Sequence, residues 1–283
     1  MKKLTIAIIG TGNIGTDLLL KILKIPSFEI IIFCGRRSTS EGIKIANSKG
    51  IAVSDLGINF FKSNPKCCEI VFDCTNAKDA RVHAEIFQKQ QIKVIDLTPA
   101  NVGVFSIPSV EKLRNEMNIN MITCGGQASI PLLHSISKYC GELFYVEVVS
   151  QIASDSAGMA TRINIDKYIE TTEKAIYQFT KTEKCKVILN LNPAIPQVDM
   201  QTTMFIKAKS FDFESIISGI YQKIKELKDY IPYYQLVMPP TMNNNILVLS
   251  VRVKGSGDYL PEYAGNLDII NCAAIEITNK IYE

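Results

Sequence analysis

Short apolar runs alternate with stretches of helical periodicity through the first part of the chain. The apolar runs span residues 4–9, 29–34, 69–73, 93–96 and 118–123, with helix-like stretches such as 16–23 and 77–90 between them. This alternation is typical of a parallel sheet with crossover helices. Several runs end at Gly or Asp, where the carboxyl edge of such a sheet binds ligands. We therefore predict an α/β, Rossmann-type dinucleotide-binding domain over residues 1–125.

The pattern changes after about residue 141. Apolar runs at 143–152, 185–191, 203–207 and 245–253 are separated by helical periods at 165–179 and 213–227. Because strands and helices no longer alternate, an α+β domain with a mainly antiparallel sheet is expected over 126–263. We assign catalysis and dimerisation to this domain. The final stretch, 264–283, is predicted to be a helix that returns to the first domain.

Composition and charge narrow the class of protein. The 283 residues include 31 basic and 28 acidic ones, a net charge of +3, which is too mild for a nucleic-acid or membrane-surface patch. No apolar run approaches the length that crosses a bilayer. The basic start and its apolar run end at a glycine loop without a cleavage pattern, so we interpret them as a strand. We expect a cytoplasmic protein without nucleic-acid or membrane partners.

The eight cysteines are scattered through apolar runs. This distribution is typical of buried thiols in a reducing compartment, not of a disulfide framework. The chain has two histidines and no pair of them at metal-ligand spacing, so no metal site is expected.

The segment IAIIGTGNIGTD at residues 6–17 contains GxGxxG directly after a buried-strand run and before a helix. Such glycines permit a tight turn and let the backbone approach a pyrophosphate at the helix N-terminus. The motif predicts that the chain binds NAD. The second strand ends with Gly35-Arg36-Arg37, without the acidic residue that usually holds the ribose 2′-OH. Arg36 or Arg37 could hold a 2′-phosphate, which would admit NADP, or both could be solvated arginines beside the adenine.

Cys124 has a context unlike that of the other cysteines. It ends the strand-like run 118–123, and an amphipathic helix follows with Pro131 assigned to its first turn. A helix N-terminus lowers a thiol pKa, and Gly125 and Gly126 would let backbone N–H groups converge as an oxyanion hole. A strand-end cysteine can equally be structural. Cys74 is the rival nucleophile, since it too ends a strand.

Six segments together resemble the acylating acetaldehyde dehydrogenases from end to end. They are GTGNIGTDL at 10–18, DLTPA at 96–100, TCGGQA at 123–128, SDSAGMATRINID at 154–166, LNPA at 191–194 and YLPEYAGNLDI at 259–269. The resemblance implies the two-domain plan of glyceraldehyde-3-phosphate dehydrogenase. It also implies oxidation of a short-chain aldehyde such as acetaldehyde, with CoA as acyl acceptor. A 4-hydroxy-2-oxoacid aldolase is the partner it implies, and a homodimer is expected from the β-rich second domain.

The resemblance also implies roles for individual residues. Cys124 matches the nucleophile and Asn266 the nicotinamide-side asparagine, although Asn266 could simply be a helix cap. The other cofactor-binding positions fall in two loops, of which the second could be only a glycine-containing loop before a helix. The positions are Thr11, Gly12, Asn13 and Ile14 in the first loop, and Ser156, Ala157, Gly158, Met159, Ala160, Thr161, Arg162, Ile163 and Asn164 in the second.

The chain departs from the family pattern at two places. Thr202 stands where an aspartate that aids the cysteine is expected, and Asp199 lies three residues earlier, so the general base is unassigned. The stretch 234–258 is also shorter than its usual counterpart. A semialdehyde or acyl-phosphate reductase is the alternative enzyme, for which Arg162 is the main candidate cation. A catalytically silent nucleotide-binding protein is the alternative from another class.

Overall fold

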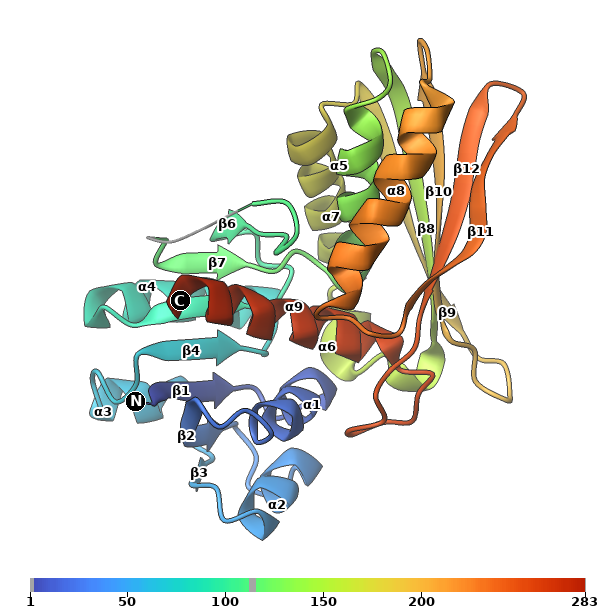
Figure 1. The fold of residues 1–283 in the computed structure, drawn as a ribbon. Helices are drawn as coiled ribbons and strands as arrows, with labels where there is room; N and C mark the ends of the chain where they lie inside the picture. The colour runs from blue at the N-terminus through green and yellow to red at the C-terminus, as the bar shows by residue number, and fades with distance from the viewer. Residues whose placement is uncertain (1–2, 112–115, 283) are drawn as a thin grey trace.

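The computed structural model describes residues 3–111 and 116–282. Its first part is a seven-stranded sheet in the order β3-β2-β1-β4-β5-β7-β6, with every pair parallel (Figure 1). The strands are β1 (Leu4–Ile9), β2 (Phe28–Cys34), β3 (Val53–Ser54), β4 (Ile70–Asp73), β5 (Lys93–Asp96), β6 (Val104–Phe105) and β7 (Asn118–Asn120). The helices around it are α1 (Asn13–Ile22), α2 (Glu41–Ser48), α3 (Ile58–Ser63) and α4 (Ala77–Gln90).

The apolar runs become the centre of this sheet because they are buried on both faces. All four residues of β4 are buried, and β4 ends level with β5, with Asp73 opposite Asp96. The loops at this carboxyl edge lead directly into helices. Asn76 begins α4 by accepting hydrogen bonds from the N–H groups of Lys78 and Asp79. Polar side chains are thereby gathered at one edge.

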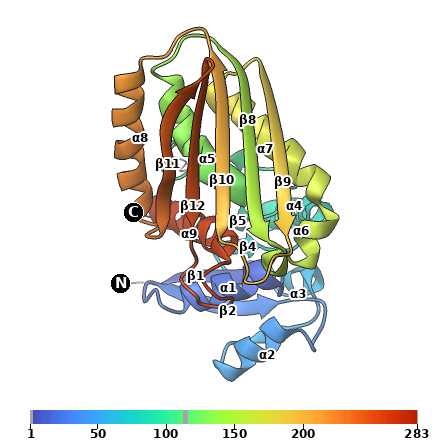
Figure 2. The same cartoon turned by 90° about the vertical axis from the view of Figure 1, so that its right-hand side faces the viewer.

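The second part is a five-stranded sheet in the order β11-β12-β10-β8-β9, antiparallel except for the pair β8 and β9. Three helices cover one face of it, and no described element covers the other face (Figure 2). The strands are β8 (Leu143–Ala153), β9 (Lys184–Asn192), β10 (Met200–Ala208), β11 (Tyr234–Asn243) and β12 (Ile246–Val253). The helices are α5 (Cys124–Ser137), α7 (Ile165–Thr180) and α8 (Phe213–Lys228), and the connection η1 (Ser154–Ser156) to α6 (Met159–Ile163) precedes α7.

The last helix, α9 (Gly265–Tyr282), returns to the first sheet (Figure 1). Ile270, Ala273 and Ile277 belong to the same buried cluster as β1 and α1, whereas Ile269 belongs to the core of the second part. The predicted fold, a Rossmann-type parallel sheet with a mainly antiparallel α+β second domain, is confirmed. The predicted domain boundary at residue 125 stays a prediction. Helix α9 contributes side chains to the cores of both parts.

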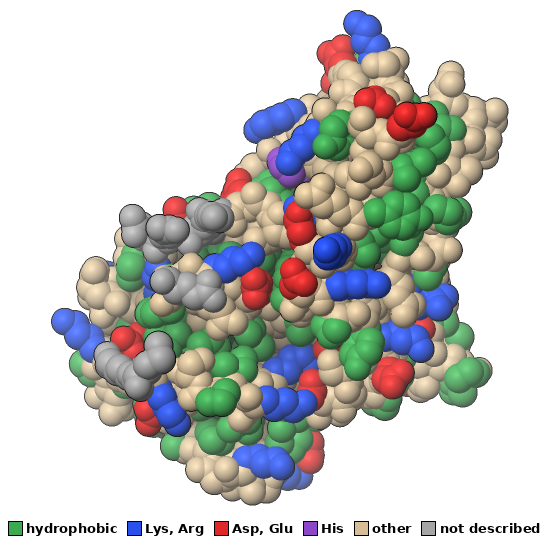
Figure 3. Space-filling view, in the orientation of Figure 1, with side chains coloured by type: hydrophobic (Ala, Val, Ile, Leu, Met, Phe, Trp, Pro, Cys, Tyr) green, Lys and Arg blue, Asp and Glu red, His purple; other side chains and the backbone are tan. Residues whose placement is uncertain are grey.

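The surface fits the small net charge. On the face shown in Figure 3, basic and acidic side chains are interspersed, not gathered by sign. Within 3–111 and 116–282, no helix combines the length and apolar character that crossing a bilayer requires.

Strand β11 is absent from the sequence-based prediction. It contains Pro239 and Pro240, which interrupt the strand pattern, and it lies at the sheet edge, where proline is tolerated. The turn to β12 uses Asn244 and Asn245 at φ values of 47° and 62°. Asparagine tolerates this left-handed conformation, so the pair closes a tight hairpin.

Candidate active site

A strained turn delivers Cys124 to the carboxyl edge of the first sheet. Strand β7 ends at Asn120, before the expected residue 123, because the chain turns through Ile122 at a φ of 64°. A β-branched residue in this conformation costs roughly 1–2 kcal/mol. The turn is held by the Asn120 Oδ1, which accepts from the Ile122 N–H at 2.8 Å. The Gln127 amide donates to the Met121 carbonyl at 2.9 Å, so the turn is fixed from both sides.

Cys124 is the first residue of α5. Thr123 caps the helix, and its hydroxyl oxygen accepts from the Gly126 N–H at 3.0 Å. Because the helix starts at Cys124, Pro131 lies inside it and not in its first turn, which corrects the sequence-based assignment. The half-buried thiol thus lies at the positive end of a helix dipole.

Tyr168 of α7 contacts this helix start. Its hydroxyl lies 3.6 Å from Cys124 Sγ and accepts a hydrogen bond from the Gly125 N–H at 2.9 Å. A Cβ added to Gly125 would lie 2.3 Å from that hydroxyl and 2.7 Å from Ser150 Oγ. Glycine at 125 is therefore needed for the approach of these two side chains. No motif singled out Tyr168, because a contact between positions 44 residues apart leaves no pattern in the sequence.

The expected oxyanion hole is not formed by Gly125 and Gly126. The Gly125 N–H already has an acceptor in Tyr168, and the Gly126 N–H has one in Thr123. Both donors are committed to holding the start of α5. This could not be predicted from the sequence, because a pair of glycines is compatible both with close packing and with open N–H groups.

The cavity in front of Cys124 has no charged side chain in its lining among the described residues. Its walls come from both parts of the molecule, including Ile14, Cys74, Thr98, Ile152, Asn164 and Ile270. Burial raises the pKa of the Cys124 thiol, and hydrogen bonds with Tyr168 and the Gly125 N–H oppose that rise without reversing it. The direction is opposite to the one expected from the helix N-terminus alone.

Cys74, the rival thiol, lines the same cavity but has different neighbours. Burial, and then the charges of Asp73 and Asp96, raise its pKa well above the ordinary thiol value. Cys74 is thus held as a thiol by two carboxylates, whereas Cys124 has hydrogen bonds that favour its thiolate. The comparison favours Cys124 as the nucleophile.

Thr202 and Asp199 do not line the cavity. Thr202 is buried on the inner side of β10 and shares a hydrogen bond of 3.0 Å with Ser150 Oγ. Asp199 lies 3.7 Å from Arg252 and 4.0 Å from Lys254, an ion-pair cluster away from the thiol. Neither position supplies a carboxylate to Cys124.

The glycine loop opens into a larger cleft that joins the thiol cavity through shared walls at Ile14, Cys74 and Thr161. Thr11, Gly12, Asn13 and Ile14 all line this cleft. A Cβ at Gly10 or Gly15 would lie 2.4 Å or 1.9 Å from a backbone oxygen, whereas a Cβ at Gly12 would meet nothing within 4 Å. Gly12 therefore faces the open space in which a pyrophosphate would lie.

The second predicted loop lies across the cleft from the first. Ser156, Gly158, Met159, Ala160, Thr161 and Ile163 line the cleft, and Asn164 lines the thiol cavity. The Asn13 amide donates to the Ser156 carbonyl at 3.5 Å, which ties the two loops together. Ala157 and Arg162 line neither space. The Arg162 guanidinium turns back to the carbonyls of Ser154 and Ala157, so it braces its own loop.

Asn266 lies in the wall of the thiol cavity, and its buried Oδ1 has no hydrogen-bond partner among the described residues. An unpartnered buried oxygen requires a donor. The carboxamide of a nicotinamide is such a donor, so Asn266 fits the nicotinamide of a bound NAD and Gly12 its pyrophosphate.

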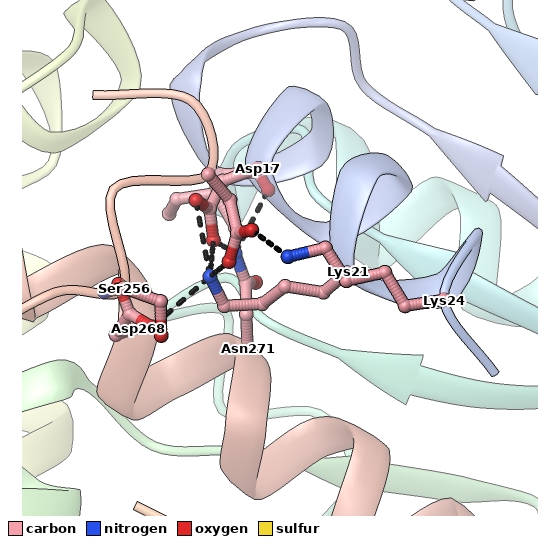
Figure 4. A network of polar contacts seen from close by, with 8 residues as sticks. Asp17, Lys21, Lys24, Ser256, Asp268 and Asn271 are labelled. Atoms are coloured by element: carbon pink, nitrogen blue, oxygen red, sulfur yellow. Dashed lines mark hydrogen bonds and ion pairs between the residues drawn. The ribbon is translucent and has the colours of Figure 1, made fainter. Parts of the chain in front are cut away.

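A buried charged cluster ties the loop before Asn266 to α1 (Figure 4). Lys21 Nζ lies 3.0, 2.6 and 3.0 Å from the carboxylates of Asp17, Asp258 and Asp268. Although burial opposes the charged form, Asp17 and Asp268 raise the pKa of Lys21, so the ammonium is retained. Asn271 adds a hydrogen bond to Asp17 at 2.7 Å. The cluster fixes α9 and its preceding loop beside the glycine loop.

The two arginines after β2 differ in their neighbours. Arg36 forms an ion pair of 3.1 Å with Asp79. Arg37 is exposed and has no ion pair within the described part of the chain. Both line the nucleotide cleft, and of the two Arg37 is available to an anion.

Comparisons with known proteins find matches for both parts of the chain. Residues 124–261 match the family model described as prokaryotic acetaldehyde dehydrogenase, dimerisation. Residues 5–110 match the model described as semialdehyde dehydrogenase, NAD binding domain. The chain is 51% identical over 281 residues to an acetaldehyde dehydrogenase of Spirochaeta aurantia, covering 99% of this chain and 95% of that protein. It is 49% identical over 284 residues to one of Pectobacterium atrosepticum, covering 99% and 96%.

A solved structure shares the whole fold. The aspartate semialdehyde dehydrogenase II of Vibrio cholerae, crystallised with ASA, superposes with a TM-score of 0.69 and covers 100% of this chain and 99% of that one. At 12% identity this likeness concerns the fold alone. It supports the two-domain plan expected from the sequence.

Proposed function

The chain belongs to the acetaldehyde dehydrogenase family, and on that premise we propose that it converts a short-chain aldehyde to the acyl-CoA through a thioester on Cys124. Acetaldehyde is the first substrate we propose. The observation that carries this proposal is the continuity of two spaces: the cavity in front of Cys124 shares the walls Ile14, Cys74 and Thr161 with the cleft of the glycine loop. A nucleotide in the cleft and an aldehyde on the thiol would therefore meet.

In the first step the Cys124 thiolate attacks the aldehyde carbonyl carbon. The C–S bond forms, and the π electrons of the carbonyl move to oxygen to give the oxyanion of a thiohemiacetal. When bound, NAD would accept the hydride that leaves this carbon, and the adduct on Cys124 would become an acyl thioester. The thiol of CoA then attacks the acyl carbon, the bond to Cys124 breaks, and the cysteine thiolate leaves. The thiol proton goes to water in the cleft.

The chain's own residues would bind and orient the cofactor. Thr11, Gly12, Asn13 and Ile14 would hold the pyrophosphate through backbone N–H groups, and the unpartnered Asn266 Oδ1 would accept from the nicotinamide amide. The second loop, from Ser156 to Asn164, would close the opposite side. NADP would be accepted as well, because Arg37 has no ion-pair partner in the described structure and lines the same cleft.

A reductase for acyl phosphates or acidic semialdehydes is less well supported. Such substrates carry anionic groups that need cationic partners near the nucleophile. No charged side chain of the described residues lines the cavity at Cys124, and Arg162 is committed to carbonyls of its own loop. An uncharged aldehyde suits this cavity better.

We propose a homodimer for the assembly. The uncovered face of the second sheet is an extended surface, and it lies within residues 124–261, the range that matches the dimerisation model (Figure 2). A 4-hydroxy-2-oxoacid aldolase that delivers the aldehyde is a further proposed partner.

One assay tests the proposed activity. Purified protein is mixed with NAD or NADP, acetaldehyde and CoA, and reduced nicotinamide is followed. We expect turnover that requires CoA and is lost in Cys124→Ser. Turnover that requires phosphate in place of CoA would favour the reductase, and cofactor binding without turnover would favour a silent nucleotide-binding protein.

A further inference from the structure

The hydrogen bonds around the start of α5 assign the protons of the two threonine hydroxyls near Tyr168. The Thr172 hydroxyl donates to the Tyr168 carbonyl at 2.7 Å, so its single proton is used there. In the 2.7 Å contact between Thr172 and Thr123, Thr123 must therefore be the donor. The Thr123 oxygen in turn accepts from the Gly126 N–H.

The Tyr168 hydroxyl oxygen has its own acceptor role. It receives the Gly125 N–H at 2.9 Å, which occupies one lone pair and leaves its proton free to be donated. Cys124 Sγ, at 3.6 Å, is an acceptor for this proton, and the Thr123 hydroxyl also interacts with the phenol. Burial, and then the proximity of Cys124, raise the pKa of Tyr168 well above its ordinary value, so the phenol keeps its proton when a thiolate forms beside it.

The setting makes this one hydrogen bond important. Besides Cys124, the titratable side chains that line the cavity, among the described residues, are Cys74 and Tyr168, and no Lys, Arg or His lies there to balance a thiolate. Neither Thr202 nor Asp199 supplies a base. The thiolate must be favoured by neutral donors and by the helix N-terminus.

We propose that Tyr168 is a catalytic residue: its phenol O–H donates to Cys124 Sγ and favours the thiolate over the thiol. The proposal deepens the proposed function, on which it rests for the identity of the nucleophile. Thr123 and Thr172 act as positioning residues, since Thr172 bonds the Tyr168 carbonyl and Thr123 caps the helix that begins at Cys124. Tyr168 lowers the fraction of thiol at neutral pH and takes no proton itself.

The test is the rate at which iodoacetamide alkylates Cys124 as a function of pH, read by mass spectrometry of the peptide that contains it. Tyr168→Phe should slow alkylation at pH 7 on the order of tenfold, because a hydrogen bond to a charged group is worth about 1.5 kcal/mol or more. At high pH the variant and the natural protein should converge. Unchanged alkylation across the whole pH range would overturn the proposal.

Tyr234→Phe is the matched control. The buried Tyr234 hydroxyl of the natural protein also bonds to α5, donating to the Ala128 carbonyl at 2.6 Å. In the described structure this hydroxyl forms no hydrogen bond with Cys124 Sγ. The control should lose comparable stability and keep the natural alkylation profile. Equal slowing in both variants would mean that loosening of α5, and not the phenol proton, controls the thiol.

A second variant keeps the test informative if Tyr168→Phe fails to fold. A ring-fluorinated tyrosine at position 168 retains the acceptor for Gly125 and donates more strongly, so it should speed alkylation below neutral pH; no change or slowing would contradict the proposal. Because alkylation needs no aldehyde, NAD or CoA, its outcome is independent of turnover. The proposed function fails instead if Cys124→Ser keeps CoA-dependent activity.

Discussion

The two ends of the cleft use different chemistry. The nucleotide end has Arg36 and Arg37 at its rim and a buried charged cluster around Lys21 behind it. The thiol end has no charged side chain in its described lining, and Cys124 is held by neutral hydrogen bonds with Tyr168 and by a helix start. Both ends are built where the first sheet meets the second domain.

The difference fits what each end has to do. Fixed charges suit the nucleotide end because α1, α9 and the glycine loop must stay in one arrangement around an anionic ligand. A nearby carboxylate at the thiol end would oppose the thiolate, whereas a nearby ammonium would favour the thiolate but would also attract other anions. Neutral hydrogen-bond donors lower the pKa of the one thiol that they contact and do not attract other ions. We therefore expect changes at one end to leave the other largely intact.

The largest effect should come from Lys21→Met. Removing this ammonium leaves Asp17, Asp258 and Asp268 close together with only the exposed Lys24 opposite them. Loss of one partner of a buried ion pair costs about 3–5 kcal/mol. Chemical denaturation should show this loss in the free energy of unfolding. In folded protein, NAD should bind more weakly while Cys124 alkylation is unchanged.

Lys24→Met is the control for that variant. The Lys24 side chain is 66% exposed and contacts Asp258 alone, so its loss should cost less than about 1 kcal/mol. If Lys21→Met slowed alkylation of Cys124 as much as it weakened NAD binding, the two ends would be coupled and the comparison would be wrong.

The second effect is a dependence of the free energy of unfolding on pH, caused by Asp96 at the end of β5. Burial, and then the charge of Asp73, raise the pKa of Asp96 to about 7. A carboxyl whose pKa is raised by folding stabilises the folded state at low pH, and this stability is lost as pH rises from about 4 to about 7. Asp96→Asn lacks that loss, so relative to the natural protein it should become more stable as pH rises. A stability difference that stays constant between pH 5 and pH 7.5 would argue against a raised pKa.

The third effect distinguishes the roles of two glycines at the nucleotide end, Gly12 in ligand binding and Gly15 in packing. Gly12 has an extended backbone and open space around its Cβ position, so Gly12→Ala should fold with unchanged stability. Its methyl group would enter the space of the pyrophosphate and weaken NAD binding on the order of tenfold. Gly15→Ala is the contrast, since its Cβ would lie 1.9 Å from the Gly10 carbonyl oxygen and should destabilise the fold itself. Titration calorimetry and thermal unfolding together check both outcomes. An NAD affinity in Gly12→Ala equal to that of the natural protein would exclude a pyrophosphate beside Gly12.

The smallest effect concerns cofactor choice. Arg37→Ala should weaken NADP binding about threefold relative to NAD, as expected for one exposed ion pair. Arg36→Ala should change the ratio less, because Arg36 already pairs with Asp79. Fluorescence titration of both cofactors gives the ratio. An unchanged ratio in Arg37→Ala would remove this arginine from 2′-phosphate recognition.

Local sequence patterns were enough to predict most of the framework. Helix α4 and strand β5 have the predicted bounds because each is a continuous pattern ending at a cap or turn residue. The GxGxxG loop could also be predicted, since its glycines are required by the local backbone of the turn. Strand β11 was missed because Pro239 and Pro240 mask an edge strand.

The thiol end was less readable because it depends on contacts distant in sequence. The sequence favoured Cys124, but it suggested that Gly125 and Gly126 leave their N–H groups open. Instead, the Gly125 N–H donates to Tyr168, which lies 43 residues further along the chain. The left-handed Ile122 was missed as well, although the Asn120 and Gln127 side chains that hold its turn are close to it in sequence.

The most direct test of the account is the intact mass of the protein after reaction with NAD and acetaldehyde in the absence of CoA. We predict one acetyl group on Cys124, formed with one equivalent of reduced nicotinamide, and its removal as acetyl-CoA when CoA is added. Cys124→Ser should form no such adduct and no reduced nicotinamide. An acetyl group on another residue, or continued turnover in Cys124→Ser, would contradict the thioester mechanism.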